Sequence, residues 1–312
     1  IAKNESDLKR YRASLKPGDI ALLGCLTEGG QGLATANNGK FIAVRKSSKW
    51  SAGIIESRPK KLAEAMENNP TLARELDYVS PIDYIAGLTE QEIAEKFDEL
   101  KEKYGRDIFG QGYIYRLIDD SEIADVDALT EDEKSNGIST EKKFYVPYDK
   151  GDKDGNRWYL ETPFAIAWSK ENVQFLKTNS GKKGEGMPVV RNPQFYFKEG
   201  FCWSDINTTF LKCRKKSKSI NDVKSMSLYG LLHFVPEFYI ICMINSSFMS
   251  HYVDDFVNNT QTFQINDARQ LPILIPNERQ LAEFNQIFNK AIKIKKAEFQ
   301  GLKSSSDSEI EL

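Results

Sequence analysis

Two segments rich in strand-forming residues are separated by a long stretch with a helical pattern, and this division constrains the fold most. Residues 17–58 and 141–300 contain short apolar and aromatic runs bounded by Gly, Pro and Asn, a pattern typical of strands and turns. Between them, residues 59–140 show helical spacing followed by an acidic run. We therefore expect an α+β fold, in which a helical and acidic insertion interrupts one β-rich domain.

Capping signals predict the helices of this insertion. Thr89 and Glu92 form a capping box, Gly105 ends the helix, and Ile93 and Phe97 begin its apolar face. Prolines 59 and 70 are expected in the first turns of two further helices. The eight acidic residues within 119–133 predict a solvated surface loop or linker, because their spacing matches no calcium-binding loop.

The C-terminal part of the chain predicts an edge strand followed directly by a long helix. Residues 270–276 carry two prolines, which restrict a strand to a sheet edge. The helical stripe that follows consists of Leu281, Phe284, Phe288, Ala291 and Ile292. A shorter helix is expected at 245–257, a lead-in at 1–16, and a disordered Ser-rich, acidic tail at 301–312.

Composition excludes several classes of protein. No apolar run is long enough to cross a membrane, and the first residues show no signal-peptide pattern. We therefore expect a soluble, cytoplasmic piece of a longer polypeptide. Four scattered cysteines and two histidines lack metal-site spacing. We therefore expect buried thiols, no metal site and no cofactor bound by this chain.

Positive charge is concentrated in one part of the sequence. The net charge is −2, yet residues 170–218 contain eleven Lys or Arg and four acidic residues, a local excess of +7. Such a local excess, and not the net charge, is what matters for binding to nucleic acid. Within it, the basic run 212–218 offers contacts to phosphates or, alternatively, forms an ordinary solvated loop.

A Gly-rich loop at 28–40 and an aromatic segment at 191–204 are the other notable motifs. The first is expected to be a hairpin whose Gln, Thr and Asn side chains offer donors and acceptors to base edges. In the second, Asn192–Phe195 differs from the Asn-Pro-Pro-Tyr motif of amino-methyltransferases because Gln194 replaces the second proline. We expect no catalytic role for it, and we expect Trp203 to pack in the core.

Together these segments resemble the C-terminal, TaqI-like target-recognition regions of Type IIG restriction–modification enzymes and of BREX-type adenine-specific DNA methyltransferases. Four ordered landmarks carry the resemblance: a Gln-Gly loop (31–41), Pro-Tyr-Asp-Lys-Gly (147–151), the segment 191–206, and the Leu-Pro strand with its trailing helix (271–299). Ala36 departs from the family loop, which usually has Gly there. Residues 59–140 match nothing in these families.

The resemblance implies recognition of double-stranded DNA, with an upstream adenine-N6 methyltransferase domain of the same polypeptide using S-adenosylmethionine. This chain itself is expected to be non-catalytic. Twelve residues are predicted to contact DNA, through bases or phosphates: Gln31, Thr35, Asn37, Asn38, Lys40, Lys182, Lys183, Arg191, Lys212, Arg214, Lys215 and Lys216.

Two other classes of function stay open. One is a protein–protein interaction module of a phage-defence complex that docks through the insertion 59–140. The other is a nuclease that uses the acidic residues of 119–133, although no paired carboxylates with a lysine lie at workable spacing. Asp98, Glu99 and Lys101 come nearest, but they lie within a predicted amphipathic helix.

Overall fold

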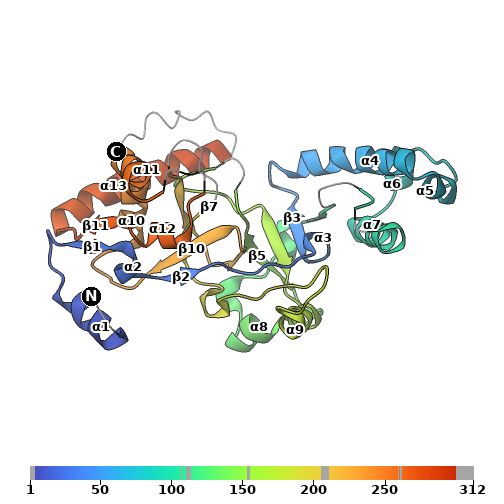
Figure 1. Ribbon diagram of the computed structural model, residues 1–312. Helices are drawn as coiled ribbons and strands as arrows, with labels where there is room; N and C mark the ends of the chain where they lie inside the picture. Colours follow the sequence, from blue (N-terminus) through green and yellow to red (C-terminus); the bar gives the residue numbers. More distant parts are fainter. Residues whose placement is uncertain are drawn as a thin grey trace. The chain divides into compact units, whose positions relative to one another are not determined.

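A computed structural model describes residues 4–105, 107–109, 114–152, 155–204, 211–258, 260 and 262–299 (Figure 1). The chain forms two compact units. Unit 1 comprises Ile1–Ala34, Asp149–Glu161 and Arg191–Leu312, and unit 2 comprises Thr35–Tyr148 and Thr162–Val190. The predicted α+β class and the long C-terminal helix are confirmed. The division into units differs from the predicted one, because the helices of 59–104 share unit 2 with the strands on either side of them.

Unit 1 is built on a four-stranded sheet in the order β2-β10-β7-β8. Its strands are β2 (Thr27–Gly30), β7 (Gly200–Ser204), β8 (Cys213–Lys216) and β10 (Ser225–Gly230), and each neighbouring pair is antiparallel. The short β9 (Ile220–Asn221) connects β8 to β10. The Gly-rich segment 28–40 is therefore not a hairpin, because β2 pairs with β10, far along the chain, and not with the strand that follows it.

Helices and a second, two-stranded sheet complete unit 1. β1 (Ile20–Leu22) pairs antiparallel with β11 (Pro272–Leu274), which confirms the strand before the last helix. The helices are α1 (Glu5–Ser14), α2 (Leu23–Leu26), α10 (Glu237–Ile244), α11 (Ser247–Phe256), α12 (Ile265–Ala268) and α13 (Glu278–Phe299). Their apolar faces meet those of the sheet in one core that contains Trp203, Ile240 and Phe288.

Unit 2 contains strands in the order β4-β3-β6-β5. These are β3 (Ile42–Arg45), β4 (Arg116–Ile118), β5 (Tyr145–Asp149) and β6 (Phe164–Ala167), and β3 and β4 run parallel. The predicted insertion thus supplies β4 to the sheet. The helices are α3 (Asn38–Phe41), α4 (Ser51–Asn68), α5 (Pro70–Glu75), α6 (Pro81–Ile85), α7 (Glu90–Tyr104), α8 (Glu131–Asn136) and α9 (Lys170–Asn179).

The helices of unit 2 follow their sequence signals with one exception. The Thr89 capping box and the end at Gly105 are both present in α7, whose Ile93 and Phe97 are buried. Pro59, however, lies inside α4, which begins eight residues earlier than predicted. The acidic run is more ordered than expected, because it forms the turns η1 (Asp120–Glu122) and η2 (Val126–Ala128) and helix α8. Among the described residues, no helix is both long and apolar enough to cross a membrane.

Candidate functional site

The structure divides the twelve predicted DNA contacts equally between the units. Unit 1 holds one set of six: Gln31, Arg191, Lys212, Arg214, Lys215 and Lys216. Unit 2 holds the other six: Thr35, Asn37, Asn38, Lys40, Lys182 and Lys183. Each unit is therefore considered as a separate candidate surface.

In unit 1, two predicted segments come together as the paired loops, which we define as residues 30–34 and 191–198. The Asn192 side-chain amide donates a hydrogen bond of 2.9 Å to the Gln31 carbonyl oxygen. A Cβ atom at Gly30 would lie 2.7 Å from that amide nitrogen, so a larger residue there would displace the Asn192 side chain. The contact holds the Gln31 backbone against the side chain of Asn192, which follows Arg191 in sequence, and both Gln31 and Arg191 are half-exposed.

The first of the paired loops is held by the backbone of β9 and the residue after it. The Leu33 amide donates to the Asn221 carbonyl oxygen at 2.8 Å, and a Cβ atom at Gly32 would lie only 1.8 Å from the same oxygen. The side-chain oxygen of buried Asn221 has no hydrogen-bond partner within the described part of the chain. Gly32 therefore allows a backbone contact that no other residue type would permit without displacing the loop.

The second of the paired loops is anchored by its aromatic residues. Phe195 stacks on Tyr229 with 4.9 Å between ring centroids, and the Tyr229 hydroxyl donates to the Phe195 carbonyl oxygen. Phe197 is also buried and adopts a positive φ of 62°, with its amide bonded to the Ser219 carbonyl oxygen. With these rings turned inward, Gln194 and Lys198 are exposed on the outer face of the loop.

A buried ion pair lies beneath β7 and β8. The Arg214 guanidinium donates to Asp149 Oδ1 at 2.9 Å, while Cys202 and Ser225 donate to Asp149 Oδ2. Burial raises the pKa of Asp149, but Arg214 and Lys216 lower it by more, so the carboxyl stays ionised and its pKa lies below the usual value. The Asp149 carbonyl oxygen also accepts the Asp222 amide at 2.9 Å, which joins this pair to the end of β9.

Lys216 is a second buried cation, and it holds the loop 191–198 in place. Its ammonium donates to the carbonyl oxygens of Lys198, Ser217 and Ser219 at 2.8, 3.1 and 2.9 Å. Burial lowers the pKa of Lys216 to about 8. Arg214 and Lys216 thus differ from the prediction, because their charged groups are buried inside unit 1 and are not accessible to a DNA phosphate. The residues alternate along β8, so that only Lys215 between them is exposed.

The two other predicted contacts in this run, Lys215 and Lys212, lie in different surroundings. Lys215 lies 3.7 Å from Glu199 and lines a cavity of about 260 Å³ that Glu237 also lines. The nearby carboxylates weaken its attraction for a phosphate. Lys212 is half-buried beside Gly155. The basic run 212–218 is therefore less cationic at the surface than its composition predicts.

In unit 2, the predicted residues lie around the C-terminal half of α9. The Lys40 ammonium lies 4.9 Å from the Phe175 ring centroid, and Phe41 packs against the same ring. Lys182 donates to the Asn179 side chain, and its neighbour Lys183 is exposed. Lys40 lies on α3, and Lys182 and Lys183 follow the end of α9; we call these three exposed lysines the cationic patch.

The three amide and hydroxyl residues predicted here have local structural roles. Thr35 is buried and donates to Asn38 Oδ1 at 2.5 Å. Asn37 caps α3 by accepting the Lys40 amide at 3.3 Å. Asn37 and Asn38 are half-exposed, whereas Thr35 serves to shape the turn.

Sequence reasoning missed several residues that build the paired loops, namely Asp149, Asn221 and Asp222. The sequence holds one signal for Asp149, because it lies in the Pro-Tyr-Asp-Lys-Gly landmark at 147–151. No local pattern identifies Asn221 or Asp222, whose backbone carbonyl oxygens carry the contacts. Trp203 is buried and donates to the Phe263 carbonyl oxygen, which confirms its role in the core.

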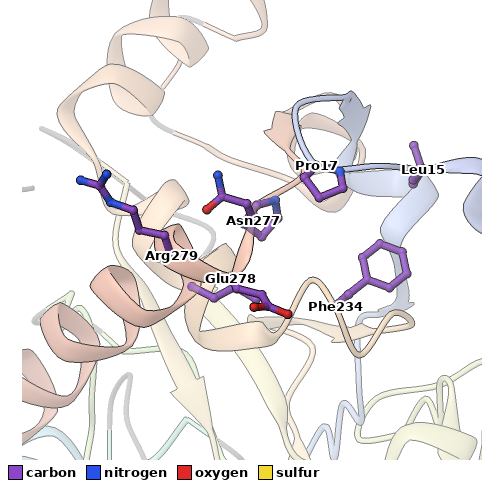
Figure 2. Close-up of a pocket in the computed structure, with 8 residues that line it drawn as sticks. Leu15, Pro17, Phe234, Asn277, Glu278 and Arg279 are labelled. Atoms are coloured by element: carbon purple, nitrogen blue, oxygen red, sulfur yellow. The ribbon is translucent and has the colours of Figure 1, made fainter.

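A larger cavity of about 610 Å³ lies at the start of α13, and Figure 2 shows its lining. Leu15, Pro17 and Phe234 form its apolar walls, and Asn277 caps the helix by accepting the Gln280 amide at 2.9 Å. None of the twelve predicted residues lines this cavity, so it is distinct from the paired loops. In the described part of the chain, no cluster of three or more His, Cys, Asp or Glu residues could hold a metal ion.

Comparison with models of known families gave no match to this chain, and comparison with curated protein sequences also gave none.

Proposed function

We propose that this chain recognises a specific sequence in duplex DNA and serves as the specificity region of an adenine-N6 DNA methyltransferase or restriction enzyme. The observation that carries the proposal is the 2.9 Å hydrogen bond between Asn192 and Gln31, which joins the paired loops. Gln31, Arg191 and Gln194 all belong to unit 1, where Gln31 and Arg191 are half-exposed and Gln194 is exposed. Arg pairs with guanine and Gln with adenine through two hydrogen bonds each in the major groove.

The cationic patch of unit 2 is assigned to phosphate contacts. Lys40, Lys182 and Lys183 would supply affinity that depends on salt but not on base sequence. We assign methyl transfer, with S-adenosylmethionine as cofactor, to an upstream domain of the same polypeptide. Methyl transfer by residues 1–312 alone would contradict that assignment.

Binding to a randomised pool of duplex DNA, measured by fluorescence anisotropy at two salt concentrations and followed by sequencing of the bound fraction, tests the proposal. Arg191→Ala should relax the preference at one base pair, at a cost of about 1–3 kcal/mol for the preferred sequence. The double variant Lys182→Ala/Lys183→Ala should weaken binding to all sequences and reduce the slope of log K against log salt by roughly 2.

Lys60→Ala/Lys96→Ala is the matched control, since both lysines are exposed on helices of unit 2 outside the patch. An equal loss in the control would contradict the phosphate role of Lys182 and Lys183. Absence of binding to any duplex at low salt, with the protein folded, would contradict the proposal as a whole.

A protein-docking function is the second candidate, and exposed apolar residues of unit 2 favour it. Tyr78 is 71% exposed and adopts a positive φ of 52°, next to an equally left-handed Asp77. Ile55 and Ile82 are also largely exposed. Backbone strain of this kind concentrates at functional positions. A folded chain that binds no duplex DNA would favour this function over DNA recognition.

A further inference from the structure

The C-terminal end of α13 is basic, and none of its lysines is among the twelve predicted contacts. Residues 289–299 contain four lysines and one glutamate. The glutamate, Glu298, lies 2.9 Å from the ammonium of the buried Lys295, so these two charges compensate each other within the helix. Three exposed lysines remain, and within the described residues none of them has a carboxylate partner: Lys290, Lys293 and Lys296.

A short segment of unit 1, residues 155–159, lies against this end of the helix. The Tyr159 ring meets the Phe299 ring edge-on with 5.9 Å between centroids, and the Lys296 ammonium lies 5.4 Å from the Tyr159 ring centroid. Lys293 precedes Lys296 by three residues, so the two lysines are neighbours on the surface of the helix. Tyr159 thus joins the basic end of α13 to the segment 155–159.

The same segment also contacts the beginning of β8. The Trp158 amide donates to the carbonyl oxygen of Cys213, the first residue of β8, at 2.8 Å. The Lys212 side chain lies against the start of the segment, since a Cβ atom at Gly155 would be 2.7 Å from its ammonium nitrogen. Lys212 and Lys296 therefore lie at the two ends of one short segment, although 84 positions separate them in sequence.

Four basic residues are gathered by this segment, and we call them the second basic surface: Arg157, Lys212, Lys293 and Lys296. Two carboxylates lie in the adjoining chain. Asp152 is buried and accepts hydrogen bonds from Asn156, whereas Glu161 is half-exposed. Positive charge therefore exceeds negative charge here, in contrast to Lys215, which lies 3.7 Å from Glu199.

We propose that the second basic surface binds the phosphate backbone of duplex DNA and gives unit 1 phosphate contacts of its own. The inference rests on the proposed recognition of DNA and extends it to residues of α13. Lysine contacts to phosphate supply affinity that depends on salt and not on base sequence. An anionic lipid surface is the poorer partner, because α13 exposes no large apolar side chain that could enter it.

The double variant Lys293→Gln/Lys296→Gln of the full chain tests this inference, with duplex DNA that the wild type binds. Gln is as good a helix former as Lys, so α13 should be preserved. Binding to all sequences should weaken to the same extent, and the slope of log K against log salt should fall by roughly 2.

Lys9→Gln/Arg279→Gln is the matched control, since it also removes two positive charges from helices of unit 1. Lys9 and Arg279 each pair with a carboxylate of their own helix, Glu5 and Glu283 respectively. The control should leave the slope nearly unchanged. An equal decrease in slope would overturn the inference, because net charge and not the position of the lysines would then govern binding.

Directed cleavage supplies a second measurement that does not depend on affinity. An iron–EDTA probe attached at Lys296→Cys, in a Cys25→Ser background because the other three cysteines are buried, should cut the backbone of the bound duplex. The same probe at Arg279→Cys, about 25 Å away along the helix at 1.5 Å per residue, should not. Absence of cleavage from Lys296→Cys on a bound duplex would contradict the inference.

The outcomes separate this inference from the proposed function. A chain that binds duplex DNA with a sequence preference, but whose slope is unchanged in Lys293→Gln/Lys296→Gln, would refute the second basic surface and leave recognition by the paired loops intact. A folded chain that binds no duplex would overturn both. Binding to vesicles of phosphatidylserine and phosphatidylcholine in place of DNA would assign these lysines to a membrane surface and refute the inference.

Discussion

At the scale of single residues, the ion pair between Asp149 and Arg214 governs how unit 1 is held together. Both side chains are buried, and they join the segment at Asp149 to β8 across 65 residues of sequence. Removing one partner of such a pair leaves an uncompensated buried charge, which costs far more than the net stabilisation that the intact pair provides. The pair therefore enforces one arrangement of the strands beneath the paired loops.

Arg214→Met should lower the free energy of unfolding by about 3–5 kcal/mol at neutral pH, as measured by urea denaturation. The double variant Asp149→Asn/Arg214→Met should lose less than the sum of the two single variants. Because the pKa of Asp149 is depressed in the folded state, the stabilisation is present above the unfolded pKa, near 4, and is lost as the pH falls. The difference between wild type and Arg214→Met should shrink accordingly in acid.

Lys60→Met is the control for this prediction. Lys60 and Glu56 also form an ion pair, but both side chains are exposed, so the loss of stability should be far smaller than that of Arg214→Met. If Arg214→Met and Lys60→Met lowered the free energy of unfolding equally, burial of the Asp149–Arg214 pair would not be what determines its contribution to stability.

At the scale of elements, glycine residues decide where the chain can approach itself closely. At Gly32, an added methyl group would collide with the backbone carbonyl oxygen of Asn221. The two segments meet here through their backbones, so the collision cannot be relieved by rotating a side chain. At Gly53, inside α4, an added methyl group would meet no atom within 4 Å. The same substitution should therefore have opposite effects at the two positions.

Gly32→Ala should destabilise unit 1 by at least about 1–3 kcal/mol, because the loop must move away from β9. Gly53→Ala should stabilise the protein by about 0.5–1 kcal/mol, because alanine favours the helix more than glycine does. Thermal unfolding of the two variants under one buffer condition measures both effects. A neutral Gly32→Ala would mean that the paired loops do not depend on this backbone contact.

Most signals confined to one element were read correctly from the sequence, with Pro59 inside α4 as the exception, whereas pairings between distant segments were not. The Thr89 capping box and the α13 stripe depend on neighbours in sequence, and both are present in the structure. The pairing of β2 with β10 depends on residues some two hundred positions apart, which no local pattern encodes. Similarly, the basic run predicted exposed charge, but alternation along β8 turns Arg214 and Lys216 inward.

At the scale of the whole molecule, each unit has a hydrophobic core of its own. Ile240 lies in the core of unit 1, and Phe97 lies in the helical core of unit 2. Cavities made in separate cores should act on separate parts of the protein, since stability is distributed among cooperative regions.

Phe97→Ala should cost about 3–5 kcal/mol and Ile240→Ala about 2–5 kcal/mol. In hydrogen exchange, Phe97→Ala should lower protection in α4 and α7 but leave β7 and α10 unchanged. Ile240→Ala should produce the reverse pattern. A uniform loss of protection across both units in either variant would show that the chain unfolds as one cooperative body.

The chain passes between the units four times, after Ala34, Tyr148, Glu161 and Val190. A gene fragment that encodes residues 35–190 would therefore carry Asp149 and Trp158 away from the core to which they belong, and the remainder would lack both. Recombination within this chain would need four matched breakpoints to keep every buried partner. Inheritance of the complete stretch is the simpler route, so under the proposed recognition of DNA we expect variation by substitution at Gln31, Arg191 and Gln194.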